Sequence, residues 1–151
     1  MIEVSLRFLV FLIAFCSTEL MAWFIHKHIM HGLLWNLHKS HHQKNHKHFF
    51  EWNDFFFLFY AILGSYLMFT GFEGYQFSFF AGLGISFYGL IYLIVHDLFI
   101  HRRVKWIKSN PSNKYLKAVR TAHRMHHKEV NKSGGEAFGL LWVSKKYFKQ
   151  R

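Results

Sequence analysis

Two histidine spacings occur twice in this chain, and they constrain its fold more than any other feature. An HxxxxH pair is followed by an HxxHH triplet in the first half, and both motifs recur in that order in the second half. The ten residues are His26, His31, His38, His41, His42, His96, His101, His123, His126 and His127. Chance predicts only about 0.09 HxxHH motifs in a chain of this length and histidine content. A histidine-rich surface patch has no reason to repeat two spacings, so the pattern indicates a set of ligands.

The number of repeated histidines indicates more than one metal ion. Neutral imidazole is the commonest protein ligand for transition metals, and ten imidazoles exceed what one tetrahedral or octahedral ion binds. The sequence therefore predicts a centre with two metals. Zn, Fe, Cu and Ni all accept histidine, so the residues alone leave the metal open. Paired iron for oxygen activation fits a membrane location and an apolar substrate better than a closed zinc site does.

The two spacings arrange their histidines differently on a helix. Residues i, i+3 and i+4 share one face, so each HxxHH triplet is expected to converge. Residues five apart point roughly 140° away from each other on a straight helix. Each HxxxxH pair therefore needs a helix end, a local π-helical turn, or two different metals to serve. We expect the clusters to bridge both metals across helix extensions, and His28, His46 and His48 to face solvent or an interface.

Hydrophobic residues are segregated from cationic ones along the chain. They make up 52% of the sequence, yet the mean hydropathy is only +0.06 because lysine, arginine and histidine offset them. The apolar residues gather in segments 4–24, 55–72 and 77–95, each close to the roughly 20 residues that a membrane span needs. A tight turn at 71–76 joins the last two into a helical hairpin. The prediction is an all-α integral membrane helical bundle with three to four transmembrane helices, in which Cys16 is a small buried residue.

The distribution of positive charge predicts an orientation. With three spans, residues 25–54 and 96–151 lie on one side of the membrane, and they contain 18 of the 19 lysines and arginines. The positive-inside rule assigns these segments to the cytoplasm. All four histidine clusters fall in or beside them. We therefore expect one domain over residues 1–151 whose histidine-rich two-metal cap lies on the cytoplasmic side.

Carboxylates near the clusters could fix the orientation of the imidazole rings. A histidine that binds metal through one ring nitrogen usually donates the N–H of the other nitrogen to such a group. The candidates are Asp97, Glu19, Asp54 and Glu136. Asp97 is the best of them, although a salt bridge with Arg102 or Arg103 is an equal alternative. For Glu19, which lies inside the first span, a functional role and a carboxylate that reaches the membrane interface are equally supported.

The residues around these motifs indicate which family of histidine-rich membrane proteins the chain resembles. The relevant stretches are 19–23 (ELMAW), 26–32 (HKHIMHG), 33–42 (LLWNLHKSHH), 51–54 (EWND), 96–102 (HDLFIHR), 122–127 (AHRMHH) and 136–142 (EAFGLLW). Together they resemble bacterial-type β-carotene 3-hydroxylases of the fatty acid hydroxylase superfamily. Histidine boxes alone recur across membrane hydroxylases and desaturases, but the combination of MHG at 30–32 with GLLW at 139–142 is similar to the carotenoid branch.

The resemblance implies a non-haem di-iron monooxygenase in the cytoplasmic membrane of a bacterium. Such an enzyme uses O2 to hydroxylate C3 of a β-ionone ring, converting β-carotene through β-cryptoxanthin to zeaxanthin. It also implies that the ten repeated histidines bind two iron ions and that electrons come from reduced ferredoxin and its reductase. The partners expected are a carotenoid, the ferredoxin and membrane lipid, with no nucleic acid.

Three other functions share part of this pattern. A carotenoid ketolase, or a related lipid desaturase or hydroxylase, could have the same histidine boxes and differ only in its product. A non-enzymatic metal-binding membrane transporter is the third alternative. Transporters place polar ligands near the middle of the bilayer, whereas these histidines cluster at one surface.

Overall fold

The computed structural model describes residues 2–43, 49–106 and 111–149, and every regular element in these ranges is helical. The elements are α1 (Ile2–Phe24), η1 (Ile25–Leu33), α2 (Trp35–His42), α3 (Asp54–Thr70), α4 (Phe77–Tyr92), η2 (Leu93–Ile100), α5 (Lys114–His126) and η3 (Lys145–Phe148). The expected all-α class is confirmed. The expected hairpin turn is also present, with Gly74 and Tyr75 at positive φ.

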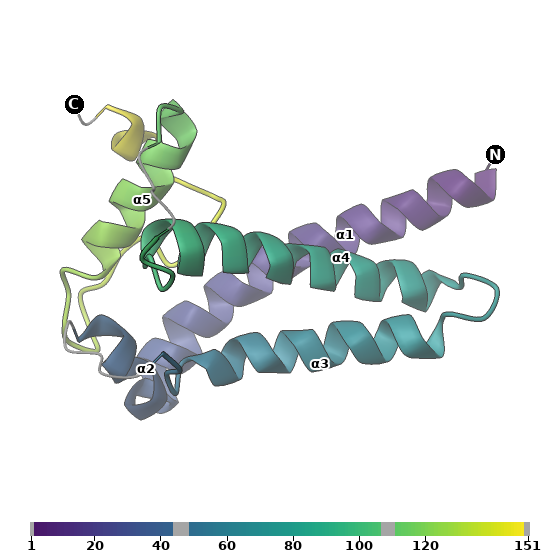
Figure 1. The fold of residues 1–151 in the computed structure, drawn as a ribbon, viewed down its shortest axis with the longest axis horizontal. Helices are drawn as coiled ribbons and strands as arrows, with labels where there is room; N and C mark the ends of the chain where they lie inside the picture. Colours follow the sequence, from purple (N-terminus) through teal and green to yellow (C-terminus); the bar gives the residue numbers. More distant parts are fainter. Residues whose placement is uncertain (1, 44–48, 107–110, 150–151) are drawn as a thin grey trace.

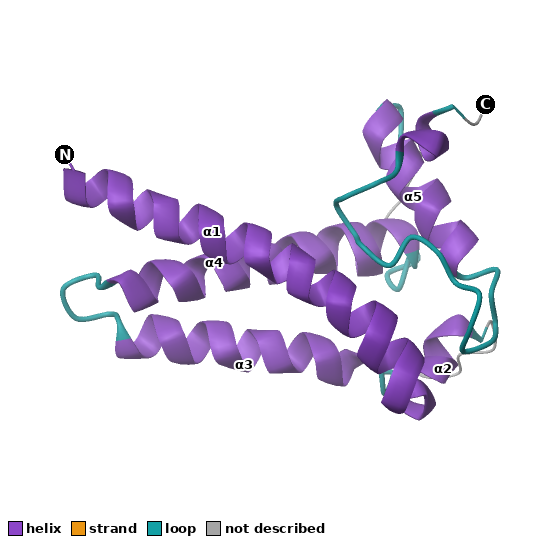
Figure 2. Ribbon diagram, turned by 180° about the vertical axis from the view of Figure 1, so that it is seen from behind, coloured by secondary structure: helices purple, strands orange, loops and turns teal. Residues whose placement is uncertain are grey.

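Helix α4 forms the centre of the bundle. It packs against α1 and against α3, to which the short loop 71–76 joins it (Figure 1). The chain start lies near that loop, while α2 and α5 gather at the opposite end of the long helices. Figure 2 shows the same arrangement from behind, with α1 crossing α4 obliquely. The two short helices and the C-terminal segment therefore form a cap on one end of a three-helix bundle.

Two glycines on α4 allow its neighbours to approach closely. A Cβ at Gly82 would lie 2.5 Å from the carbonyl oxygen of Gly64 on α3. A Cβ at Gly84 would lie 2.5 Å from the carbonyl oxygen of Phe11 on α1. Both distances are too short for any real carbon–oxygen contact. Small residues thus allow close helix packing on both faces of α4.

The outer surface of the bundle is apolar. Side chains such as Phe8 (58% exposed), Ile62 (61%) and Phe69 (84%) point away from the other helices. The continuous helices Ile2–Leu33 and Phe77–Ile100 are long and apolar enough to cross a membrane, and neither is mostly buried within the protein. An exposed apolar surface of this extent is unusual in a soluble monomer. These helices indicate a membrane protein.

Two expectations about the spans need adjustment. Helix α3, in the second expected span, has 17 residues and is shorter than the two helices of spanning length. Cys16 is exposed on α1, so the prediction that it is buried is wrong. The reason is that an apolar run in a membrane helix need not face the protein interior, because lipid solvates it equally well.

Both long helices become π-helical where they carry an HxxxxH pair. The segment η1 contains His26 and His31, and η2 contains His96 and leads directly into His101. The backbone N–H of His101 donates to the carbonyl of His96 at 2.9 Å, which is an i to i+5 hydrogen bond. This pattern brings residues five apart closer to one face of the helix than an α-helix does. Both pairs thus adopt the expected π-helical turn, and His101 also lies at the end of its helix, which was another expected solution.

Helix α5 begins with a side-chain cap and is amphipathic. The Asn113 Oδ1 atom accepts hydrogen bonds from the backbone N–H groups of Tyr115 (2.8 Å) and Leu116 (3.3 Å). The helix ends at His126. Its buried face divides into two parts. One packs on Tyr147 of the C-terminal segment through small residues such as Ala118, and the other presents the HxxHH histidines to the cap.

Candidate metal centre

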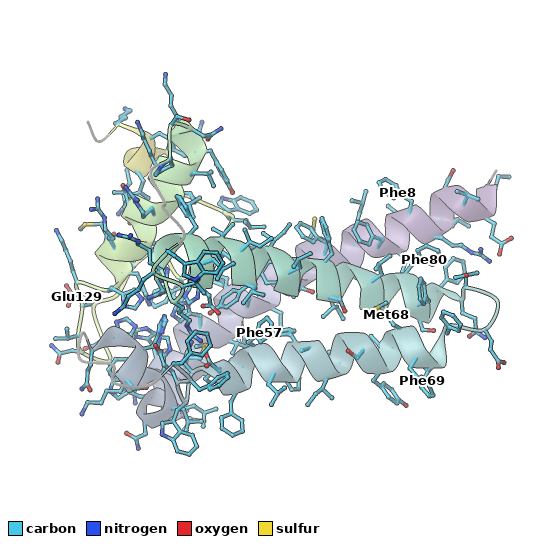
Figure 3. All side chains as sticks on the ribbon, in the orientation of Figure 1. Phe8, Phe57, Met68, Phe69, Phe80 and Glu129 are labelled. Atoms are coloured by element: carbon cyan, nitrogen blue, oxygen red, sulfur yellow. The ribbon has the colours of Figure 1, made fainter. Side chains whose placement is uncertain are left out.

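The repeated histidines meet at the capped end of the bundle, where η1, α2, η2 and α5 converge. Figure 3 shows nitrogen-bearing side chains gathered at this end, around the region of Glu129, far from Phe8, Phe69 and Phe80. Nine of the histidines form two groups, in each of which one ring nitrogen per residue lies within 4.8 Å of the others. The first histidine group is His26, His31, His38, His42 and His126, and the second histidine group is His41, His101, His123 and His127.

Each HxxHH triplet is divided between the two groups. On α2, His38 and His42 belong to the first group and His41 to the second. On α5 the division is reversed, because His126 joins the first group while His123 and His127 join the second. Residues i+3 and i+4 are about 100° apart around a helix, so they can point to opposite sides of one face. A triplet therefore serves two neighbouring sites instead of converging on one point.

His96 lies beside the second group. Its ring centroid is 4.5 Å from that of His101 and 4.7 Å from that of His123. Its Nδ1 atom is 2.7 Å from an Asp97 carboxylate oxygen, and its Nε2 atom is 3.4 Å from the hydroxyl of Tyr92. All ten repeated histidines thus lie in one buried or half-buried cluster that extends over both groups.

Every histidine of the first group has its Nδ1 atom next to an oxygen acceptor. His26 contacts the carbonyl of Phe138 (2.9 Å), His31 that of Lys132 (3.1 Å), His42 that of Glu129 (2.8 Å), His126 that of Glu136 (3.0 Å), and His38 the Asn53 side-chain oxygen (2.7 Å). These oxygens only accept, so each Nδ1 carries the proton and donates it. The Nε2 atom of each ring is then left with a bare lone pair, which is the form that binds metal.

Those lone pairs face one another. The Nε2 atoms of His38 and His42 are 3.0 Å apart, those of His26 and His38 are 3.1 Å apart, and those of His31 and His126 are 3.4 Å apart. No proton is left to bridge them, so only a cation between the rings would make the arrangement favourable. Neighbouring ligands of an octahedral ion with bonds of about 2.1 Å lie about 3.0 Å apart. The first group therefore fits a metal ion.

The second group fits a metal for a related reason. The Nε2 atoms of His101 and His123 are 2.8 Å apart. Those of His41 and His127 are buried and have no hydrogen-bond partner among the described residues. His41 already donates its other nitrogen, since Nδ1 lies 2.8 Å from a Glu51 carboxylate oxygen. Buried nitrogens without a partner are rare in proteins, and a cation would satisfy them.

Burial keeps the cap histidines neutral. Burial, with a smaller contribution from the neighbouring imidazoles, lowers the pKa of His38 to about 3, of His42 to about 4 and of His126 to about 2. The same two causes hold the pKa values of His41 and His123 well below the ordinary value. Metal binding requires the neutral imidazole. The cluster is therefore in its binding-competent form at neutral pH.

The structure assigns different positions to the expected carboxylates. Asp97 contacts His96 as described, and its other neighbour is Arg103, whose Nε atom is 3.6 Å away. The two alternatives considered for Asp97 are thus both present. Asp54 accepts two hydrogen bonds from Arg103 (2.6 and 3.0 Å) and one from the backbone N–H of Glu51 (3.0 Å). Asp54 therefore fixes the loop that carries Glu51 and does not itself contact an imidazole in these interactions.

The other two carboxylates point elsewhere. The side chain of Glu136 is partly exposed and pairs with Lys146, so it is the main-chain carbonyl of Glu136 that contacts His126. Glu19 accepts hydrogen bonds from Tyr88 and from the backbone of residues 140–142. Neither carboxylate is aimed at a ring. His28 is exposed, and His46 and His48 lie outside the described residues.

Sequence reasoning missed several groups that hold the rings. Glu51 and Asn53 lie just before the apolar helix α3, and polar residues at such a position are typical of an ordinary loop. Their position directly before a span, close after a histidine triplet, was the available signal. The four main-chain carbonyls of residues 129–138 left no signal, because any residue type supplies a carbonyl.

An apolar pocket opens between the long helices and reaches both histidine groups. Its walls include Phe56, Phe57 and Tyr60 of α3, Tyr88 and Tyr92 of α4, and Phe138, Gly139 and Leu140 of the C-terminal segment. His26, His38, His41, His96 and His123 line its polar end. Pockets with apolar walls and a few convergent polar groups are the usual form of a small-molecule site. The pocket could therefore bring an apolar molecule from the membrane side to the histidines.

Comparison with known proteins identifies the class. The fatty acid hydroxylase family model matches residues 11–147. The match covers most of the chain and all ten repeated histidines, so the chain belongs to the fatty acid hydroxylase family. The resemblance noted from its motifs is confirmed.

Individual relatives share most of the chain. It is 38% identical to the beta-carotene hydroxylase of Pantoea ananas over 136 residues, which are 89% of this chain and 76% of that protein. It is 35% identical to the beta-carotene hydroxylase of Paracoccus sp. strain PC1 over 91% of this chain and 84% of that protein. A plant relative, beta-carotene 3-hydroxylase 2 of Arabidopsis thaliana, is 37% identical over 82% of this chain and 41% of that protein. No solved structure matches the chain.

Proposed function

We propose that this protein is a carotenoid hydroxylase that uses O2 to hydroxylate C3 of β-ionone rings, taking β-carotene through β-cryptoxanthin to zeaxanthin. The observation that carries the proposal is that both histidine groups line the polar end of one apolar pocket. The relatives named above, all beta-carotene hydroxylases, support the choice of carotenoid.

The ten repeated histidines are proposed to hold two iron ions. The first group would hold one ion, and the second group, together with His96, would hold the other. When bound, the iron pair supplies activation of O2 for insertion into an unactivated C–H bond. Imidazoles suit iron as well as several other metals, and activation of O2 favours a redox-active metal such as iron over redox-inert zinc.

The chain itself contributes position and shielding. The aromatic side chains of α3 and α4 give the pocket a flat, apolar wall suited to a cyclohexene ring. Because an unactivated ring offers several similar C–H bonds, the carbon that reacts is set by where the ring rests. The oxygen acceptors behind the imidazoles fix the ring orientations before substrate arrives. Tyr92 stacks on His96 at a centroid distance of 4.3 Å, at the boundary between pocket wall and histidines.

The proposed topology follows the charge distribution. Segments 4–24, 55–72 and 77–95 would cross the membrane, with residues 25–54 and 96–151 in the cytoplasm of a bacterium and 1–151 forming one domain. Reduced ferredoxin with its reductase would supply electrons. Eighteen lysines and arginines in the cytoplasmic segments would attract such an acidic partner, as well as anionic lipid headgroups.

Product analysis in a carotenoid-producing host tests the proposal. Expression of the chain with a β-carotene supply should give zeaxanthin and β-cryptoxanthin on pigment chromatography. His123→Ala should give neither pigment while the protein still inserts into membranes, because it removes a nitrogen from the second group. His28→Ala is the matched control, since His28 is exposed and outside both groups.

Other outcomes would favour the alternatives. A C4 ketone would identify a ketolase, and a new double bond in a lipid would identify a desaturase. Metal flux across vesicles without O2 consumption would favour the transporter. The burial of the candidate ligands at one end of the bundle speaks against that last alternative.

A further inference from the structure

A buried carboxylate on the first membrane helix has a role that the histidine chemistry does not use. Glu19 is 8% exposed and lies within the long apolar helix Ile2–Leu33. One of its oxygens, Oε1, accepts three consecutive backbone N–H groups, from Leu140 (3.1 Å), Leu141 (2.8 Å) and Trp142 (3.0 Å). The other, Oε2, accepts the hydroxyl of Tyr88 on α4 at 2.6 Å. Successive N–H groups that converge on one oxygen form an anion-binding nest.

The geometry around the nest is specific. A Cβ at Gly139 would lie 3.1 Å from the same Glu19 Oε1 atom, so the small residue permits the close approach of the chain. A charged group within a membrane helix is unfavourable unless it is fully partnered. The four donors provide that partnership. They connect α1, α4 and the C-terminal segment at one point, although these elements are far apart in sequence.

The segment held by Glu19 is the one that orients the first histidine group. Directly before the nest, the carbonyl of Phe138 accepts the Nδ1 proton of His26 at 2.9 Å. The Phe138 ring packs edge-on against His31 and His126, with centroid distances of 5.2 Å to each. Phe138, Gly139 and Leu140 also form one wall of the apolar pocket. If the nest were displaced, the carbonyl that accepts from His26 and the wall of the pocket would therefore move together.

We propose that Glu19 is a positioning residue, which clamps residues 139–142 and thereby orients the first histidine group and sets the pocket wall. This proposal rests on the proposed function in one respect, that the first group binds a metal. The second histidine group would be nearly independent of the clamp. His41 of that group and the adjacent His96 are held by Glu51 and Asp97, which do not belong to the C-terminal segment.

The test compares Glu19→Ala, Glu19→Gln and the control Glu3→Ala in purified full-length protein. Glu3 is on the same helix but is exposed and pairs only with Arg7 in the interactions observed. In Glu19→Gln the amide oxygen can still accept from the nest, and the amide nitrogen can donate to the Tyr88 oxygen. We expect trypsin to cleave after Lys128 and Lys132 roughly tenfold faster in Glu19→Ala than in wild type, with Glu19→Gln much closer to wild type.

The second measurement is metal content. If Glu19 only stabilised the fold, its loss would not remove iron from one site while leaving the other site filled. We expect Glu19→Ala to lose about one of two irons, so that Mössbauer spectra of 57Fe-loaded protein lose one iron environment and keep the other. Unchanged cleavage and iron content in Glu19→Ala would overturn the proposal, and so would equal loss of both environments. The trypsin comparison is repeated on metal-free protein. A cleavage difference there in a chain that makes no zeaxanthin would uphold the clamp and refute only the proposed function.

Discussion

At the scale of single residues, the two histidine groups differ in what holds their rings. Four rings of the first group donate to main-chain carbonyls and one to an amide oxygen, all of them neutral acceptors. In the second group His41 donates to the carboxylate of Glu51, and beside that group His96 donates to the carboxylate of Asp97. A carboxylate acceptor makes an imidazole a stronger donor to metal. The two sites should therefore bind metal with different affinity.

This difference leads to a prediction for Glu51→Gln. The amide keeps an oxygen for His41 to donate to but removes the negative charge, so metal affinity at the second group should fall by about 10- to 100-fold. Metal titration of the chelated protein measures this, with affinity at the first group as an internal reference. Glu73→Gln, an exposed residue in the hairpin loop, should change neither site. Equal affinities in Glu51→Gln and wild type would show that the carboxylate charge is irrelevant.

The sequence predicted which histidines lie together, and among the groups around them it predicted the contact of Asp97 with His96. That these histidines bind metal stays a prediction. The repeated spacings led to the ten residues that meet in the cap, because spacing on a helix is a property of sequence. The split of His41 from His38 and His42 depends on how α2 is rotated against α5, which requires tertiary packing. The role of Glu19 was left open for the same reason, since the nest it binds lies more than a hundred residues away.

At the level of elements, the close packing of α3 on α4 depends on Gly82 of α4 and on Gly64 of α3. Because a Cβ at Gly82 would lie 2.5 Å from a backbone oxygen of α3, Gly82→Ala must push the helices apart. We expect a loss of about 1–3 kcal/mol in stability, seen as a lower melting temperature in detergent. Gly89→Ala is the matched control on the same helix, since its nearest neighbour would be a Phe57 ring atom at 3.7 Å. Equal melting temperatures for the two variants would contradict the packing account.

The helices α2 and α5 should also make stability depend on pH. Burial lowers the pKa of His38 to about 3 and of His42 to about 4, whereas unfolded histidine titrates near 6.5. The unfolded chain therefore binds more protons than the folded one as the pH falls below about 6.5, and folding free energy is lost. Metal-free protein should have a nearly constant melting temperature above about pH 7.5 and a falling one below about 6.5. A constant value down to about pH 5 would mean that the rings are not buried in the folded state.

At the scale of the whole molecule, polar and apolar burial are separated. The long helices expose apolar side chains along their length, while the buried histidines lie together at one end. The hydrophobic segments and their hairpin were readable from sequence because lipid imposes a length and a composition on each span. For the cap, the sequence predicted only the set of candidate ligands. Its closure by the C-terminal segment depends on carbonyls and on the Glu19 nest, which have no pattern in the sequence.

The iron content of purified protein decides whether the histidines form two metal sites. We expect about two irons per chain in wild type. We expect about one in His38→Ala/His42→Ala, which disrupts the first group, and about one in His101→Ala/His127→Ala, which disrupts the second. Active protein with a single iron, or the loss of both irons in each double variant, would contradict the assignment of the histidines to two sites.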